Sequence, residues 1–310
     1  MMRLVPFLLS SLAIASCDSG EAPRTPVVTG GSAGTAAAGG SMNLSGSPAL
    51  SGASGSSVGG APLTPQGGTG GTGALAGSSH AGSGGSEPPL EPFRLLWRDD
   101  FDSFDPNRWT KATHTFPENL AHFSAANVVV EDGLLKLRVT EAQSSDKPYT
   151  AAEVYSAQEF KFGRFEGRIK FCAGSGLVSS LFTYKEDVEQ SWQEIDIEHL
   201  GNLPQSIQYN LIYGTLAERK YQPKVVTLGY TPTTEFHDYA IEWTPAGITF
   251  YIDGHQSHHD VQATIQDPAK LRMNAWPTDN SITSFAGPLD ASAIPCEAQY
   301  DWVQVSSYTP

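Results

Sequence analysis

Short apolar runs separated by turn residues fill residues 92–310 and limit the folds open to this chain. Stretches such as NVVVEDGLLKLRVT and FGRFEGRIKF are rich in Val, Ile, Leu and Phe, and turn residues recur every ten or so positions. Asp132-Gly133 and Asp253-Gly254 favour tight hairpin turns, and a longer turn is expected at residues 245–247. Long helical periodicity is absent. The pattern predicts an all-β fold, a single two-sheet antiparallel β-sandwich of the jelly-roll, concanavalin A-like kind.

Residues 18–91 have a very different composition. Of the 31 glycines in the chain, 20 lie between residues 18 and 90, and that stretch contains no aromatic residue. A segment with so few large apolar side chains cannot bury enough surface to offset the entropy lost on ordering. We therefore predict a disordered Gly/Ser/Ala-rich linker over residues 18–91, followed by one folded domain over residues 92–310.

Residues 1–17 resemble a secretory signal peptide, with a basic start, an apolar run from Leu4 to Ala15 and small residues at its end. The apolar run is too short to span a bilayer as a helix. The stretch IASC at residues 14–17 also resembles the end of a bacterial lipoprotein signal, in which Cys17 would carry the lipid. Ordinary signal cleavage after Ala15 is the alternative. We expect a cell-envelope lipoprotein anchored at Cys17, with a secreted, extracellular protein as the alternative.

The remaining two cysteines are Cys172 and Cys296. Outside the cytoplasm such a pair can form a disulfide, and two buried thiols are the alternative. Their spacing in the sequence does not decide between these two states.

The folded domain is acidic. The formal charge of the whole chain is −14, and removing the balanced segment 1–86 together with Glu87 and Glu91 leaves −12 for residues 92–310. An acidic domain binds nucleic acid poorly, so no nucleic-acid partner is expected. Neutral polysaccharides need no basic surface and remain suitable substrates. We expect a monomer.

The stretch QEIDIEHLGN at residues 193–202 sets three acids at every second position, namely Glu194, Asp196 and Glu198. Side chains alternate along a strand, so these acids share one face about 6.8 Å apart, and Ile195 and Ile197 share the other. A solvated face of an edge strand, a metal site and an acid/base site are all compatible with this row. A straight row of acids diverges, which suits hard cations poorly. Retaining glycoside hydrolysis needs two carboxyl groups roughly 5 to 5.5 Å apart, and curvature of a cleft could bring them together.

The acid row and its surroundings resemble glycoside hydrolase family 16, in its bacterial lichenase-like branch. AAEVYSAQEFKFGRFEGRIKF, EFHDYAIEWTPAGITFYIDG and AQYDWVQVSSY look like family blocks in the family's order, and the resemblance runs from about residue 94 to 308. The motif lacks the extra residue that related laminarinases insert before the last Glu. The resemblance implies a retaining endo-β-glucanase that cuts β-1,4- or β-1,3-1,4-linked glucan through a covalent glycosyl-enzyme.

Two alternatives stay open beside this hydrolase. A transglycosylase acting on β-glucan or xyloglucan would keep the fold and the first chemical step, and the sequence does not separate it from a hydrolase. A non-catalytic carbohydrate-binding surface protein is the other alternative, and the intact Glu194 and Glu198 argue against it.

The resemblance also implies roles for individual residues. Glu194 corresponds to the nucleophile, Glu198 to the general acid/base, and Asp196 to the partner that tunes the nucleophile, with no cofactor needed for catalysis. Glu198 must be protonated to donate to the leaving oxygen, and nearby carboxylates raise its pKa. Trp192 corresponds to a tryptophan that stacks on the substrate. Four further positions match sugar contacts, although each could be only structural: Glu153, Asn210, Asn274 and Trp276.

Four positions depart from the lichenase pattern, which would put Asp at Gln193, an aromatic residue at His199, Arg at Tyr155 and Tyr at Ile212. These departures leave the choice among lichenan, xyloglucan and other β-glucans open. The disulfide of close lichenases would join segments near residues 121 and 151, which hold Ala here. Any disulfide in this chain is therefore a different one.

A structural calcium is a further implication of the resemblance, with Asp301, Gly133 and Asp100 at the matching positions. Asp301 could equally form a pair within the fold. Three histidines follow the Asp253-Gly254 turn, and we interpret them as exposed hairpin residues rather than a metal site: His255, His258 and His259.

Overall fold

The structure is a computed structural model that describes residues 92–142, 146–261 and 265–310. The expected signal peptide, the lipid-bearing Cys17 and the linker all fall at residues 1–91, outside the described residues. Within the described ranges there are 17 strands, three short 3-10 helices and one four-residue α-helix. No helix in these ranges is long and apolar enough to cross a membrane.

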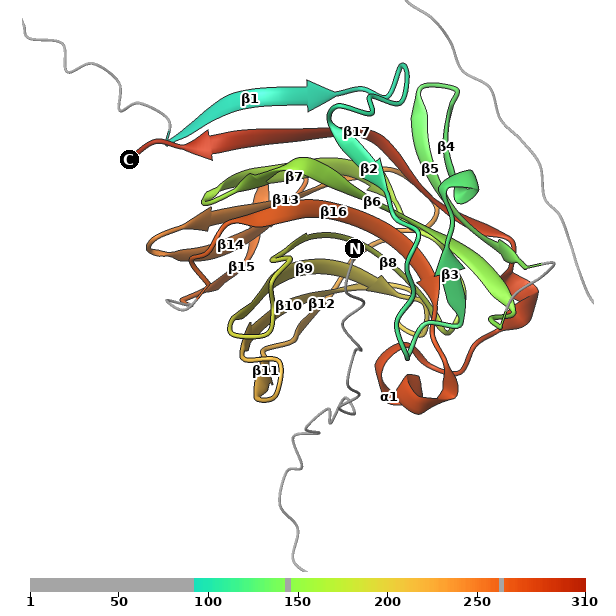
Figure 1. Ribbon diagram of the computed structural model, residues 1–310. Coiled ribbons are helices and arrows are strands. Elements are labelled where there is room, and N and C mark those ends of the chain that lie inside the picture. Colours follow the sequence, from blue (N-terminus) through green and yellow to red (C-terminus); the bar gives the residue numbers. More distant parts are fainter. Residues whose placement is uncertain (1–91, 143–145, 262–264) are drawn as a thin grey trace, which may run out of the picture. The chain divides into compact units, whose positions relative to one another are not determined.

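The acid-rich segment belongs to one curved layer of strands, here called the cleft layer (Figure 1). In spatial order its strands are β2 (Trp109–Lys111), β6 (Tyr149–Phe160), β16 (Ala269–Pro277), β8 (Leu177–Tyr184), β9 (Trp192–Leu200) and β10 (Ser206–Gly214), and both β11 (Arg219–Tyr221) and β12 (Lys224–Thr227) pair with β10.

A second layer, the outer layer, packs behind the first (Figure 1). It runs from β4 (Val128–Glu131) and β5 (Leu134–Glu141) through β17 (Cys296–Tyr308), β7 (Gly163–Lys170), β13 (His237–Thr244) and β14 (Gly247–Ile252) to β15 (His255–Asp260), and β1 (Phe93–Asp99) pairs with the C-terminal half of β17. The pairings are antiparallel, with one exception where β3 (Ala121–Phe123) runs parallel to β6.

The remaining elements are short and lie at the chain reversals: η1 (Ala125–Asn127), η2 (Asn280–Ile282), α1 (Thr283–Ala286) and η3 (Ala291–Ala293). The two layers meet at one edge, where Thr140 of β5 pairs with Thr150 of β6. The predicted all-β, two-layer antiparallel sandwich is confirmed.

The strands follow from alternation in the sequence. In β7, which reads GRFEGRIK, Phe165 and Ile169 are buried between the layers, and the charged residues between them are only partly buried. A side chain of this size contributes about 1.5 to 3 kcal/mol when it is fully buried. The period of two therefore fixes which face of each strand enters the core.

Two of the predicted turns are confirmed and the third is not as expected. Asp132 and Gly133 have φ of 57° and 71°, and Asp253 and Gly254 have φ of 49° and 75°, as a tight hairpin turn with two left-handed residues requires. The expectation of a longer turn at residues 245–247 is wrong. Thr244 pairs directly with Gly247, so only two residues form that loop.

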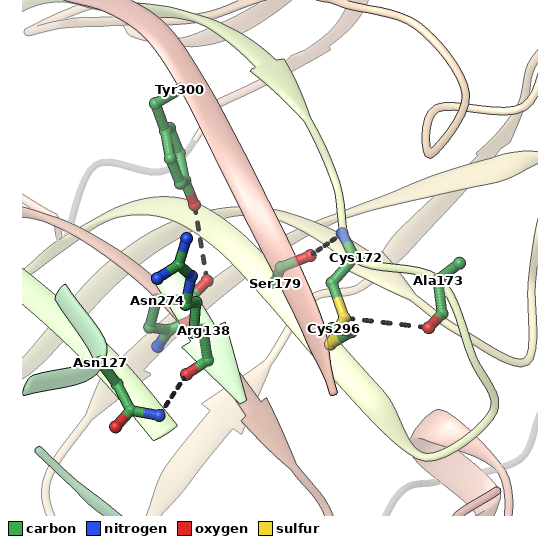
Figure 2. Close-up of a disulfide and its surroundings, with 8 residues drawn as sticks. All are labelled: Asn127, Arg138, Cys172, Ala173, Ser179, Asn274, Cys296 and Tyr300. Atoms are coloured by element: carbon green, nitrogen blue, oxygen red, sulfur yellow. Dashed lines mark hydrogen bonds between the residues drawn. A yellow bond between two sulfur atoms is a disulfide. The ribbon is translucent and has the colours of Figure 1, made fainter. Parts of the chain in front are cut away.

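A disulfide joins Cys172 to Cys296, with the two Cα atoms 5.8 Å apart (Figure 2). This bond resolves the alternative that the sequence left open. Cys172 follows β7 and its backbone N–H donates to Ser179 Oγ on β8, 3.2 Å away. Cys296 is the first residue of β17. The bond therefore ties the connection between the two layers to the start of the last described strand.

Candidate active site

The acid row lies on a central strand of the cleft layer. β9 pairs with β8 on one side and β10 on the other, so it is not an edge strand. Ile195 and Ile197 are fully buried toward the outer layer, and the acids point the other way. The structure thus excludes the interpretation of the acids as a solvated face of an edge strand.

A cavity of about 910 Å³ opens over this face of the cleft layer. Its lining comes from five neighbouring strands, β6, β16, β8, β9 and β10, from β11, from η2 and α1, and from the loops that precede β3, β9, β11 and β12. The lining residues include His114, Phe116, Glu118, Glu153, Ser180, Phe182, Tyr184, Glu186, Trp192, Glu194, Asp196, Glu198, Gln208, Asn210, Ile212, Arg219, Lys220, Tyr221, Arg272, Asn274, Trp276 and Phe285. All eight predicted catalytic and sugar-binding residues therefore meet in one cleft.

Glu194 is half-buried, and its carboxylate accepts a hydrogen bond of 2.7 Å from the indole Nε1 of Trp192. Burial raises the pKa of Glu194 to about 7. The Trp192 hydrogen bond and the positive charges of Arg272 and Arg219 oppose that rise, and the charge of Glu153 adds to it. The carboxylate form of Glu194 is thus stabilised by one hydrogen-bond donor and two cations.

Asp196 is the most deeply buried of the three acids. Burial raises its pKa well above the usual value, and the charges of Glu194 and Glu198 and a hydrogen bond with Glu194 raise it further. A protonated Asp196 can donate its proton in that hydrogen bond. It then stabilises an ionised Glu194 without adding a second negative charge.

Glu198 lies opposite Gln208 on β10, and its carboxyl group accepts a hydrogen bond of 3.1 Å from the Gln208 amide. Burial raises the pKa of Glu198 to about 8, the Gln208 hydrogen bond opposes the rise, and the charge of Glu194 adds to it. The sequence predicted that neighbouring carboxylates would be the cause. Burial is the larger cause, because the acid sits in a walled cleft rather than on an open face.

The floor of the cleft beside these acids is a polar network. Glu153 on β6 accepts hydrogen bonds from Arg272 at 2.7 Å and from the Asn274 amide at 3.3 Å. Asn274 in turn accepts a hydrogen bond of 2.5 Å from Ser180. Asn210 lies opposite Asp196 on β10, and its buried Oδ1 has no partner among the described residues. An unpaired acceptor of this kind suits a sugar hydroxyl.

Comparison with known proteins identifies this arrangement. The family model described as glycosyl hydrolases family 16 matches residues 118–304, which include the acid row and every predicted sugar-contacting position. The chain belongs to this family. It is a glycoside hydrolase, and the resemblance found in the sequence is confirmed.

Among the proteins that the chain resembles, a β-glucanase of Brevibacillus brevis is 32% identical over 242 residues, which is 76% of this chain and 89% of the relative. A β-glucanase of Bacillus subtilis (strain 168) is 30% identical over 208 residues, which is 66% of this chain and 84% of the relative. The crystal structure of a prokaryotic β-1,3-1,4-glucanase (lichenase) derived from a mouse hindgut metagenome matches with a TM-score of 0.62 and 29% identity, covering 69% of this chain and 99% of that one. The Bacillus licheniformis β-glucanase matches with a TM-score of 0.61 and 29% identity, covering 67% of this chain and 96% of that one.

The two tryptophans in this family 16 cleft are less open than a sugar-stacking role suggests. The guanidinium of Arg219 lies over the Trp192 ring, 4.6 Å from its centroid, and Tyr184 meets the ring edge-on at 5.6 Å. Trp276 is 8% exposed and packs edge-to-face against Phe116 at 4.9 Å. A sugar that stacks on Trp192 has to share the ring with Arg219 or displace the guanidinium. The Trp276 ring is mostly covered by other side chains, so it offers little surface for stacking.

Two departures from the lichenase pattern face the core rather than the cleft. Gln193 is buried, and its side-chain oxygen accepts hydrogen bonds from the backbone N–H groups of Gln266 and Asp267. His199 donates from Nδ1 to the Ser206 carbonyl at 3.2 Å, and burial lowers its pKa to about 4, so it is neutral. Both side chains therefore bond to the backbone of neighbouring segments and do not face the cleft.

Sequence reasoning missed several cleft residues, among them three that act on the acids: Gln208, Arg272 and Arg219. Gln208 lies two positions before Asn210, and Arg272 lies two positions before Asn274, so the period of two along β10 and β16 could have found both. Arg219 stands on β11, a three-residue strand, and no periodic signal marks it.

The residues predicted to hold calcium lie outside the cleft. The register that pairs Tyr300 with Leu135 brings the turn at Gly133 next to Asp301, and Asp100 follows β1, which also pairs with β17. Asp301 forms an ion pair of 3.4 Å with Arg168, and Asp100 accepts a hydrogen bond of 2.7 Å from Arg98. The backbone placement suits a shared ion, but a cation would have to displace both guanidinium groups. The calcium site stays a prediction.

The described residues contain no group of three His, Cys, Asp or Glu side chains that could hold a metal. Of the three histidines after the Asp253-Gly254 turn, His255 and His259 are exposed, as expected, and His259 bonds with Thr249. The expectation is wrong for His258, which is half-buried because its ring stacks on Phe250.

Proposed function

We propose that this protein is an endo-β-glucanase that cleaves mixed-linkage β-1,3-1,4-glucan with retention of configuration at the anomeric carbon. One observation carries the proposal: Glu194, Asp196 and Glu198 share the cleft face of a central strand. The substrate class is supported by the β-glucanases and the β-1,3-1,4-glucanase (lichenase) that the chain resembles.

In the first step, the Glu194 carboxylate attacks the anomeric carbon and forms an ester bond with it. The bond from that carbon to the glycosidic oxygen breaks, and Glu198 gives its proton to this oxygen. The released chain carries a new hydroxyl group, and Glu198 is left as the carboxylate. The raised pKa of Glu198 suits this step, because the acid is still protonated near neutral pH.

In the second step, Glu198 takes a proton from water, and the water oxygen bonds to the anomeric carbon. The ester bond breaks and its electron pair returns to the Glu194 carboxylate. Two displacements at one carbon give net retention. Esterification removes the charge of Glu194, which had raised the pKa of Glu198, so Glu198 becomes a base at the point where a base is needed.

The test is to assay the full-length wild-type protein and a Glu194→Gln variant on barley β-glucan and lichenan, measuring new reducing ends. The wild type should release them, and Glu194→Gln should be inactive because an amide cannot form the ester. Glu189→Gln is the matched control, since Glu189 is an exposed acid that does not line the cleft. Activity that persists in Glu194→Gln contradicts the assignment.

Further measurements on the wild type test which glucan it prefers and whether the glycosyl group passes to water or to another sugar. The wild type should cut barley β-glucan and lichenan faster than xyloglucan or laminarin. NMR of the first products should show the β-anomer before mutarotation. A labelled oligosaccharide acceptor that becomes longer, with few new reducing ends, would instead assign a transglycosylase. Tight binding of intact glycan without cleavage would assign a binding protein.

We also propose that the domain is exported and held at the cell envelope by a lipid on Cys17, and that it acts as a monomer. The signal-like residues 1–17 and the Gly-rich residues 18–91 support this location. Membrane fractionation of the wild type and a Cys17→Ser variant tests the anchor. Cys17→Ser should leave the membrane fraction, and equal partitioning of the two proteins contradicts the proposal.

A further inference from the structure

Arg272 is an unusually constrained cation beside the catalytic acids. It lies on the cleft face of β16 and is 7% exposed. Its guanidinium carbon is 4.8 Å from the ring centroid of Tyr155 and 4.8 Å from that of Tyr184. Two aromatic rings from the strands on either side of β16 thus hold one guanidinium between them.

The Arg272 guanidinium is also fixed by two carboxylates. NH1 donates to Glu153 Oε1 at 2.7 Å, and NH2 donates to Glu186 in the loop between β8 and β9. The Nε atom is buried and has no partner among the described residues. Burial of a charged group is costly, and pairing with carboxylates only offsets the loss of solvation.

The groups that act electrostatically with Glu194 come from its own strand and from four others, whereas β10 places the uncharged Ile212 opposite it. Its own strand supplies the hydrogen bond from Trp192 and the neighbouring acids, β6 supplies Glu153, β8 supplies the Tyr184 phenol, β11 supplies Arg219 and the Tyr221 phenol, and β16 supplies Arg272. Arg219 and Arg272 are the two cations in this set. Arg272 is the more deeply buried of the two, and its guanidinium packs on the ring of Tyr184, which lies directly opposite Glu194 in the pairing of β8 with β9.

We propose that Arg272 is a positioning residue of the glycosidase reaction, which fixes Glu153 at the cleft floor and holds Glu194 as the carboxylate that attacks the sugar. The inference rests on the proposed function. A guanidinium stays charged at any pH the enzyme meets, and a charge held rigidly out of water acts more strongly than one in solvent. Glu186 weakens the effect, because its carboxylate neutralises part of the same guanidinium.

The test compares Arg272→Met and Arg272→Lys with the wild type in the pH profile of kcat/KM. Arg272→Met removes the cation, so the acidic limb should move to higher pH and kcat/KM at pH 6 should fall about tenfold. Arg272→Lys keeps the positive charge but loses the planar guanidinium that bonds two carboxylates at once. It should therefore lose less kcat/KM at pH 6 than Arg272→Met. A merely structural role would lower activity at every pH and leave the limb in place.

Lys270→Met is the matched control. Lys270 lies on the same strand, 4.8 Å from the Tyr155 ring centroid and 3.6 Å from Glu186, but it does not line the cleft. Its removal should leave the acidic limb unmoved. A limb that moves equally in Lys270→Met and Arg272→Met overturns the proposal.

Glu186→Gln tests the same idea in the opposite direction and leaves Arg272 in place. The Glu186 side chain is 44% exposed, so the variant should fold even if Arg272→Met does not. Removing its charge should move the acidic limb to lower pH. An unmoved limb in this variant overturns the proposal.

A carbon-13 NMR titration of Glu-labelled protein, with Glu194→Gln to identify the resonance, reads the ionisation of Glu194 without any turnover. In Arg272→Met, Glu194 should lose its proton at higher pH than in the wild type, and equal titration overturns the inference. This readout also separates the two claims. A wild type that cuts no β-glucan refutes the proposed function, whereas an active wild type with an unchanged titration in Arg272→Met refutes only the role of Arg272.

Discussion

The two ends of the acid row have different surroundings, although Glu194 and Glu198 are four residues apart on one face of β9. Glu194 accepts a hydrogen bond from the Trp192 indole and is acted on by two arginines. Glu198 has one neutral partner, the amide of Gln208. Burial raises the pKa of both acids, to about 7 for Glu194 and about 8 for Glu198.

The comparison suggests how one strand can supply both the ionised nucleophile and the protonated acid that the proposed reaction requires. The two residues have the same side chain and comparable burial, so their own chemistry does not separate them. Cations gathered at one end stabilise negative charge there, and the other end has none among the causes that act on Glu198. The roles thus depend on neighbouring strands rather than on the acid row itself.

The largest expected effect comes from removing each carboxyl group in turn and adding azide. Glu194→Ala and Glu198→Ala should each lose activity by roughly 10³-fold or more. With an activated aryl glycoside, azide can enter the space left by Glu194 and give the α-glycosyl azide. In Glu198→Ala it should attack the glycosyl-enzyme from the opposite side and give the β-glycosyl azide. NMR of the products checks the assignment, and the same anomer from both variants contradicts it.

The pH profile of the wild type is the second test. Activity needs Glu194 without its proton, so it should rise as pH increases through about 7. It also needs Glu198 with its proton, so it should fall as pH increases through about 8. The result is a narrow bell in kcat/KM, with a tenfold loss per pH unit beyond each limb. A plateau that extends down to pH 5 would show that the cleft does not raise the pKa of Glu194.

A smaller change should follow when the single partner of Glu198 is removed. In the wild type, the hydrogen bond from the Gln208 amide lowers the pKa of Glu198. Gln208→Met keeps the size of the side chain but removes this donor. The alkaline limb should therefore move to higher pH, with a gain of a few-fold in kcat/KM at pH 9 relative to each protein's optimum. The acidic limb should stay in place, and movement of that limb alone would contradict the division between the two ends.

Calcium should have the smallest effect on the pKa values of Glu194 and Glu198, because the residues predicted to bind it lie outside the cleft. If Asp301, Asp100 and the Gly133 carbonyl hold the ion, added calcium should raise the melting temperature by a few degrees, and chelation should reverse the change. Asp301→Asn should remove the response. Both limbs of the pH profile should be the same with and without calcium. A melting temperature that does not change when calcium is added refutes the site.

Local alternation predicted much of this molecule. Ile195 and Ile197 enter the core and the acids face the cleft because strand side chains alternate, and that rule needs no tertiary information. The Asp-Gly pairs specify tight turns because both positions adopt left-handed backbone.

The electrostatics of the site could not be predicted in the same way. Arg272 reaches Glu153 across a strand pair separated by 119 residues in the sequence, and the register of that pair is set by the whole layer. The contact of Phe116 with Trp276 likewise depends on a loop that returns to the cleft. Both contacts join segments that are far apart in the chain, so no local pattern contains them.

The place of β17 in the outer layer has a consequence for how the protein is made. β17 is the last described strand, yet it lies between β7 on one side and β1 and β5 on the other. A nascent chain that has not yet reached residue 296 lacks the strand that joins these partners, and it also lacks Cys296, the mate of Cys172. The outer layer can therefore close around β7, β1 and β5, and the disulfide can form, only after the segment that begins at residue 296 has been synthesised.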